Sequence, residues 1–94
     1  MTANLYVPKG RGGKLPGVVG TCGHSLNGKA ERNYQSFAQG LARLGYICLL
    51  YDPFGQGERF QCVGPDLKPL HGTSVLEHLH VGNQQYLGGE FVGA

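Results

Sequence analysis

The apolar positions in the first half of the chain follow two periods, one typical of buried strands and one typical of a helix. Residues 17–22 and 46–52 are runs with few polar side chains, which predict two strands of a buried parallel sheet. Between them, apolar residues return every three or four positions and predict a helix. Its expected N-cap is Asn33 and its expected C′ residue is Gly45. The apolar positions of this helix are Tyr34, Phe37, Ala38, Leu41, Ala42 and Leu44.

A shorter apolar run, Leu5–Val7, predicts a first strand that ends at Pro8. The order strand, loop, helix, strand over residues 17–52 is that of a βαβ unit, so its two strands should run parallel with a right-handed crossover. We expect a parallel sheet of two or three strands with one crossover helix.

The regular pattern fades after residue 52. Residues 53–72 are rich in Gly and Pro and predict a long loop. Residues 74–80 favour a short helix, and residues 83–94 favour the start of another. A parallel sheet needs helices on both faces, and this chain offers one crossover helix. We therefore expect an α/β fold with an incomplete sheet, as in part of a larger domain.

The length and the charge of the chain limit the number of domains and the kinds of partner. A chain of 94 residues forms one domain at most. Its eight Lys and Arg against six Asp and Glu, without a basic stripe, imply no nucleic-acid partner. Its seventeen glycines are more than twice the usual share of about 7% and have no fixed period, which indicates many tight turns.

The cysteines are Cys22, Cys48 and Cys62, an odd number without a CxxC pair. A disulfide framework is not expected, and a reducing compartment such as the cytoplasm is mildly favoured. The opening residues MTANLYVPKG show no signal peptide, and no run is long enough to span a bilayer, so no membrane partner is expected.

The stretch GHSLNGKA, Gly23–Ala30, partly matches three functional motifs. A P-loop, GxxxxGK[ST], fits at Gly23, Gly28 and Lys29, but Ala30 stands where a hydroxyl should bind Mg²⁺. A nucleophile elbow, GxSxG, fails because Asn27 stands in the place of its second glycine.

A triad in the order Ser25, Asp52, His78 is also disfavoured, because the segment around His78 has no partner strand to position it. The third chemistry is a backbone role: a loop after a strand whose His24 or Ser25 amide donates to a developing oxyanion. On spacing alone, an ordinary turn that the glycines permit is the favoured explanation.

A longer stretch favours the oxyanion interpretation. The segments LYVPKG…LPGVV, GHSLNGKA…YQ and LARLGYICLLYDPFGQGER resemble the front half of α/β-hydrolase-fold esterases, with the acetyl xylan esterase and prolyl-oligopeptidase-like branch most similar. The segment EHLHVGNQQYLGG is similar to the family's approach to its next helix. One departure is Cys22-Gly23 in place of the His-Gly of many relatives.

The resemblance implies that residues 1–94 are the N-terminal portion of a single α/β-hydrolase domain. It implies a serine esterase that acts on a small ester, with the oxyanion-hole amides of His24 and Ser25 in this chain and no member of the triad within it. The chain alone is then expected to be an inactive fragment that needs no cofactor. The runner-up is a P-loop nucleotide-binding module with a degenerate magnesium site.

The remaining polar residues have structural interpretations. Asp52, Glu58 and Arg59 are expected to brace the glycine-rich loop, through a contact of a carboxylate with Arg59 or with backbone N–H groups. His78 and His80 diverge on a helix and make a poor metal pair. Together with His71 they are expected to be surface or loop residues, and no metal site is expected.

Overall fold

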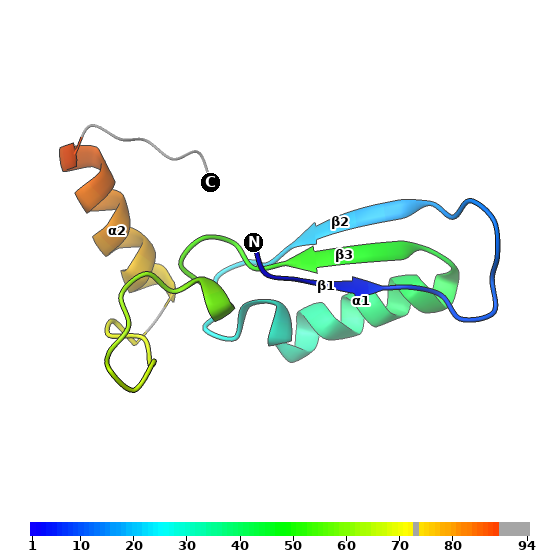
Figure 1. The fold of residues 1–94 in the computed structure, drawn as a ribbon, viewed down its shortest axis with the longest axis horizontal. Coiled ribbons are helices and arrows are strands. Elements are labelled where there is room, and N and C mark those ends of the chain that lie inside the picture. The colour runs from blue at the N-terminus through cyan, green and yellow to red at the C-terminus, as the bar shows by residue number, and fades with distance from the viewer. Residues whose placement is uncertain (73, 89–94) are drawn as a thin grey trace.

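The computed structural model describes residues 1–72 and 74–88, and three strands and two α-helices form within them (Figure 1). Short 3-10 turns at Gly28–Ala30 and Gly57–Arg59 follow the second and third strands. The principal extents are 49 × 29 × 18 Å, because the last helix lies beyond the end of the sheet. The elements are β1 (Ala3–Tyr6), β2 (Gly17–Thr21), α1 (Arg32–Leu44), β3 (Ile47–Tyr51) and α2 (Ser74–Gly88).

The sheet has the order β1-β3-β2, with β3 in the centre. β2 and β3 are parallel, with Val18 opposite Cys48, which confirms the parallel pair of the predicted βαβ unit. β1 is antiparallel to β3, so the expectation of a purely parallel sheet was wrong. The reason lies in the connection: parallel neighbours need a crossover of a dozen or more residues, whereas residues 7–16 form only a loop that reverses the chain.

Helix α1 begins two residues earlier than its sequence pattern indicated. Glu31 has extended backbone angles and accepts a hydrogen bond from the Arg32 amide through its side chain, so it is the N-cap instead of Asn33. The C-terminal prediction is confirmed, since Gly45 ends the helix with a left-handed φ of 101°. A residue with a Cβ is strained in that region, which is why glycine is preferred there.

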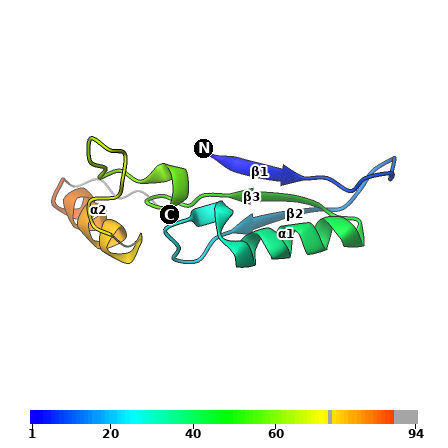
Figure 2. The same ribbon diagram turned by 90° about the horizontal axis from the view of Figure 1, so that it is seen from below.

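The core lies between α1 and one face of the sheet (Figure 2). Its buried members are Cys22, Ala38, Cys48 and Leu50, and Tyr6, Tyr34 and Leu41 pack against them. A Cβ at Gly20 would lie 3.2 Å from Leu50 Cδ1 and 3.3 Å from Phe37 Cε1, so a glycine here allows the helix to approach the sheet closely.

The opposite face of the sheet carries apolar side chains that neither helix of the described residues covers. Leu5, Leu49 and Val19 are aligned across the three strands by the register. Leu5 is 61% exposed and Val19 is 69% exposed. These two side chains are therefore largely open to solvent on the face opposite α1.

Helix α2 differs from the two short helices that the sequence indicated. It is one continuous helix, Ser74–Gly88, which runs through Val81 and Gly82 without a break. Residues 89–94, to which the second expected helix extends, lie outside the described residues. The loop before α2 is closed by an antiparallel bridge between Val63 and Pro69. Neither helix in the described part of the chain has the length and apolar character that a membrane crossing requires.

The uncovered face predicts that the isolated chain self-associates, because aligned apolar side chains on a sheet lose contact with water when two such faces meet. Val19→Lys should shift the chain toward the monomer in sedimentation velocity. Gln39→Lys adds the same charge on the exposed side of α1 and is the matched control. A wild-type chain that stays monomeric at high concentration, or two variants that behave alike, would contradict this prediction.

Candidate functional site

The loops that follow β2 and β3 meet at the carboxyl ends of the parallel strands, where Asp52 joins them. Asp52 is fully buried directly after β3. Its Oδ1 accepts the Lys29 amide at 2.7 Å, and its Oδ2 accepts the Lys29 ammonium at 2.6 Å. Thr2 Oγ1 also donates to Oδ2, at 2.6 Å. One carboxylate therefore fixes three segments that are distant in sequence.

The buried charges of Lys29 and Asp52 compensate each other. For Asp52, burial is the largest influence and works to raise the pKa, but the hydrogen bonds from Lys29 and Thr2 outweigh it and hold the pKa below its usual value. For Lys29, burial works to lower the pKa, and the bonds to Asp52 and Glu58 outweigh it and raise the pKa. Both groups are therefore ionised at neutral pH.

Two glycines make room for the Asp52 carboxylate. Gly28 and Gly57 have φ values of 51° and 55°, which side chains rarely adopt. A Cβ at Gly28 would overlap Asp52, and a Cβ at Gly57 would lie 2.8 Å from Asp52 Cγ. The glycines of the two loops thus permit a close approach to the buried carboxylate.

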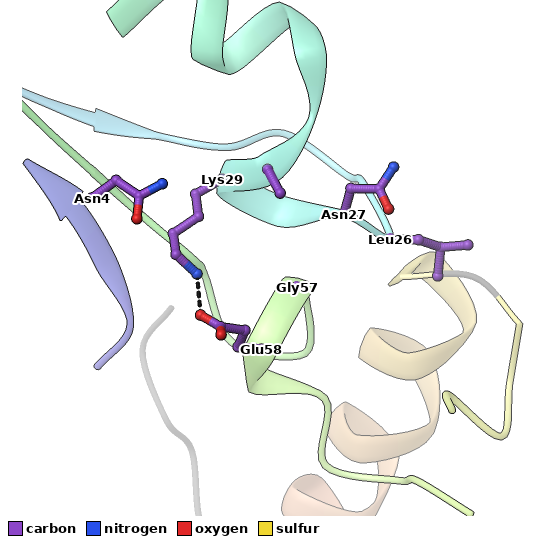
Figure 3. A pocket seen from close by; sticks show the side chains of 7 residues that line it. Asn4, Leu26, Asn27, Lys29, Gly57 and Glu58 are labelled. Atoms are coloured by element: carbon purple, nitrogen blue, oxygen red, sulfur yellow. Dashed lines mark hydrogen bonds and ion pairs between the residues drawn. The ribbon is translucent and has the colours of Figure 1, made fainter. Parts of the chain in front are cut away.

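Glu58 and Arg59 hold the second loop in different ways. The Lys29 ammonium also donates to Glu58, whose side chain is 69% exposed (Figure 3). Arg59 donates to the backbone carbonyl of Asp52 at 3.0 Å. The expected contact with backbone N–H groups is present at Asp52, whereas no carboxylate pairs with Arg59 in the described residues. Lys29, considered from the sequence only as a phosphate ligand, is the partner of both carboxylates.

The ion pair of Lys29 with Glu58 forms part of the wall of a cleft of about 390 Å³ (Figure 3). Its lining residues are Asn4, Leu26, Asn27, Lys29, Ala30, Gly57 and Glu58. A triphosphate would need the Lys29 ammonium and amide, and both are bonded to Asp52. This arrangement, together with the missing hydroxyl at Ala30, disfavours the P-loop interpretation.

The same loop opens on its other side into a cleft of about 440 Å³. Its lining residues are His24, Ser25, Leu26, Asn27, Glu31, Asn33 and Tyr34. The Ser25 amide donates to Gln56 Oε1 at 2.6 Å, so this amide points into protein and cannot also serve an oxyanion. Of the two candidate donors, only the His24 amide has no acceptor among residues 1–72 and 74–88.

The side chain of Ser25 is used within the loop. Its hydroxyl lies 3.3 Å from Glu31 Oε2, to which it donates, and it accepts the Asn27 amide at 3.2 Å. No histidine is bonded to it in the described residues. The disfavoured triad of Ser25, Asp52 and His78 is accordingly not assembled.

The rings of His24 and His78 lie together, with His24 Nε2 3.0 Å from His78 Nδ1. His78 Nε2 faces the backbone carbonyl of Phe54, which can only accept. A neutral His78 therefore donates from Nε2 and accepts at Nδ1, and His24 donates from its Nε2. This pair connects α2 to the loop after β2.

The thiols of Cys22 and Cys48 are buried, and this burial raises their pKa values. Burial raises the pKa of Cys22, and the negative charge of Asp52 raises it further. Burial also raises the pKa of Cys48. Both thiols stay protonated at neutral pH and pack as small apolar side chains.

One cluster was not foreseen. Cys62, His71 and His80 come together from the loop and α2, although their spacing matches no metal-binding motif. No pattern in the sequence predicts this cluster, because the fold of the loop between residues 62 and 71 determines how close Cys62 and His71 come.

The fold is that of a small α/β chain with a three-strand mixed sheet, in which one pair of strands is parallel. At the carboxyl ends of the parallel strands, the buried ion pair of Lys29 with Asp52 joins the loops. The chain is similar to an uncharacterized protein of Pseudomonas aeruginosa, with 37% identity over 59 residues. The match covers 62% of this chain and 15% of that protein, so the chain spans a small part of its relative's length. No protein-family model and no solved structure matches.

The ion pair of Lys29 with Asp52 predicts that substitutions at Asp52 and at Glu58 change the free energy of unfolding by different amounts. Asp52→Asn should lower the free energy of unfolding by about 3 kcal/mol, because it leaves the buried Lys29 ammonium poorly compensated. Glu58→Gln removes a carboxylate from the same ammonium but should cost less than about 1 kcal/mol, since Glu58 is mostly exposed. Urea denaturation at pH 7 measures both, and equal losses would contradict the assignment.

The same pair predicts how stability depends on pH. The folded pKa of Asp52 is lowered, so its contribution is fully present above the unfolded value of about 3.9 and is lost as the pH falls through the folded value. The folded pKa of Lys29 is raised, so its contribution is present below about 10.4 and is lost as the pH rises further. Urea midpoints across pH should show less acid dependence in Asp52→Asn than in the wild type.

Proposed function

We propose that this chain is the part of a serine ester hydrolase that carries the oxyanion-hole loop, within an α/β-hydrolase fold. In this proposal the nucleophilic serine, the acid and the histidine belong to residues outside 1–94. The observation that carries it is the His24 amide, which has no acceptor in the described residues and belongs to a loop lining a cleft.

The position of the loop supports this proposal. Ligands of parallel α/β sheets bind in crevices outside the carboxyl ends of the strands. The loop Gly23–Ala30 leaves β2 at that end, and Asp52 leaves β3 beside it. The resemblance of the sequence to esterases supplies the reaction class and the small ester as substrate.

The hydrogen bonds of the loop suit a preorganised donor. Gln56 holds the Ser25 amide, and Asp52 holds the Lys29 amide, so the backbone on the C-terminal side of His24 is held at two points. A donor that is already oriented stabilises a developing negative oxygen without reorganisation during the reaction. Ser25 is thus a positioning residue in this proposal, and His24 supplies the donor.

The chemistry follows from these roles. The serine oxygen attacks the ester carbonyl and forms a tetrahedral intermediate, whose negative oxygen accepts the His24 N–H. Collapse expels the alcohol and leaves an acyl-enzyme, which water then hydrolyses. A second donor would come from the residue after the nucleophile.

The first test is the reading frame beyond the codon for Ala94. It should encode GxSxG, followed by Asp and then His, and the protein from the whole frame should hydrolyse p-nitrophenyl acetate. A frame without this series would overturn the proposal. The 94-residue chain alone should show no turnover above buffer, and turnover abolished by Ser25→Ala would likewise contradict it.

The second test isolates the amide in the protein expressed from the whole frame. His24→Pro removes the N–H and should lower kcat about 100- to 1,000-fold, as the loss of one oxyanion donor does. His24→Ala keeps the N–H and is the matched control, so most of kcat should remain. Equal losses in the two variants would show that the ring, not the amide, matters.

The nucleotide-binding alternative has its own discriminating measurement. A P-loop module would bind ATP with dependence on Mg²⁺ and would lose that binding in Lys29→Ala. The ion pair of Lys29 with Asp52 favours the opposite result, with no Mg²⁺-dependent ATP binding by isothermal calorimetry.

A further inference from the structure

Three side chains with metal-binding atoms converge at the junction between the long loop and α2. The ligand atoms of Cys62, His71 and His80 all lie within 4.8 Å of one another. The rings of His71 and His80 have centroids 4.4 Å apart. We propose that these three residues bind a zinc ion. The proposal is independent of the esterase proposal, since the cluster includes no residue of the oxyanion loop.

The fold of the loop brings Cys62 next to His71. The Leu70 amide donates to the Cys62 carbonyl at 3.0 Å, and Val63 pairs with Pro69 in an antiparallel bridge. The Gly64 amide donates to the Lys68 carbonyl at 2.9 Å inside this turn. The chain thus reverses between residues 62 and 70, and His71 follows directly after the reversal.

Glu77 brings α2 to the same place. Its Oε1 accepts the Gln61 amide at 2.6 Å and the Cys62 amide at 2.9 Å. Residues three apart lie on the same side of a helix, so His80 is one turn along from the carboxylate that holds the Cys62 backbone. The cluster is therefore fixed by backbone hydrogen bonds on both the loop and the helix.

The buried side chain of Glu77 gives a second, independent reason for a cation here. Glu77 is fully buried, and its Oε2 has no hydrogen-bond partner among the described residues. A buried charge is costly unless it is paired or lies near a metal. The ion pairs found in residues 1–72 and 74–88 do not involve Glu77. A divalent ion held by the neighbouring Cys62 would supply the missing positive charge.

The donor set favours zinc over harder metals. One thiolate and two imidazoles are the ligands of tetrahedral zinc sites, whereas Mg²⁺ and Ca²⁺ take oxygen ligands. Bond lengths of about 2.0–2.3 Å place tetrahedral ligand atoms about 3.3–3.7 Å apart, so ligand atoms that lie within 4.8 Å of one another must approach by about 1.5 Å at most. Three protein ligands leave the fourth position to water. Cys62 and His71 are half-buried and His80 is exposed, which leaves a path for the ion to enter.

Cobalt titration of the 94-residue chain tests the site, because Co²⁺ reports thiolate ligation and tetrahedral geometry in its absorption spectrum. We expect one Co²⁺ per chain, with a thiolate-to-cobalt charge-transfer band and intense visible bands, displaced by one equivalent of Zn²⁺. Cys62→Ala should abolish the charge-transfer band. Since loss of an outer-shell partner already costs about 10- to 100-fold in affinity, His71→Ala and His80→Ala should weaken binding by more than about 100-fold.

His24→Ala is the matched control, because it removes a histidine that pairs with His78 outside the cluster. Unchanged cobalt binding in His24→Ala supports the assignment. Binding lost in His24→Ala and kept in Cys62→Ala would overturn it in favour of the other histidine pair. The absence of a charge-transfer band in the wild-type chain at millimolar Co²⁺ would also overturn it.

Alkylation of the cysteines tests the site in the wild-type chain and also shows whether each variant is folded. In the wild-type chain Zn²⁺ should protect Cys62 from iodoacetamide, measured by peptide mass spectrometry, and His80→Ala should remove this protection. Cys22 and Cys48 are buried in the core and serve as internal references for an intact fold. Equal reactivity of Cys62 with and without Zn²⁺ would count against the site.

Discussion

The buried carboxylate of Asp52 is the constraint on which the arrangement of the loops depends. It stands at the carboxyl end of the central strand and receives donors from Thr2 and Lys29, which lie before β1 and after β2. A charge in this position is tolerated only when its hydrogen bonds are made, so these donors must converge on it. The convergence joins the start of the chain to both loops.

This convergence determines which hydrogen-bond donors of the loop after β2 are already used within the protein. Because the Lys29 ammonium is bonded to Asp52 and to Glu58, the loop presents the Lys29–Glu58 ion pair, not a free ammonium, to the cleft on that side. On the other side Gln56 takes the Ser25 amide and leaves the His24 amide without a protein acceptor in the described residues. A loop that resembles a phosphate cradle in sequence is therefore better suited to donate a single backbone hydrogen bond.

The sequence predicted those features that depend on periodic apolar burial. The parallel pair β2–β3, the helix between them and its end at Gly45 follow from residue spacing alone. Features that depend on the geometry of irregular segments were missed: the antiparallel direction of β1, the cap at Glu31 and the pairing of Lys29 with Asp52. Spacing carries no information about the last of these, because it is a contact between two loops that only the folded sheet brings together.

Polar contacts hold this chain together at both ends because its apolar core is small. Among the described residues, the buried core cluster consists of Ala38 of α1 and, facing it, Cys22, Cys48 and Leu50. Helix α2 lies beyond the end of the sheet and does not cover it (Figure 1). Buried positions of α2 include Ser74 and Glu77, so its attachment relies on hydrogen bonds to the loop as well as on apolar contact. Small scaffolds commonly supplement a limited core with a metal or another cross-link. A zinc ion between the loop and α2 would stabilise the junction where apolar burial is least, as the ion pair stabilises the junction at the sheet.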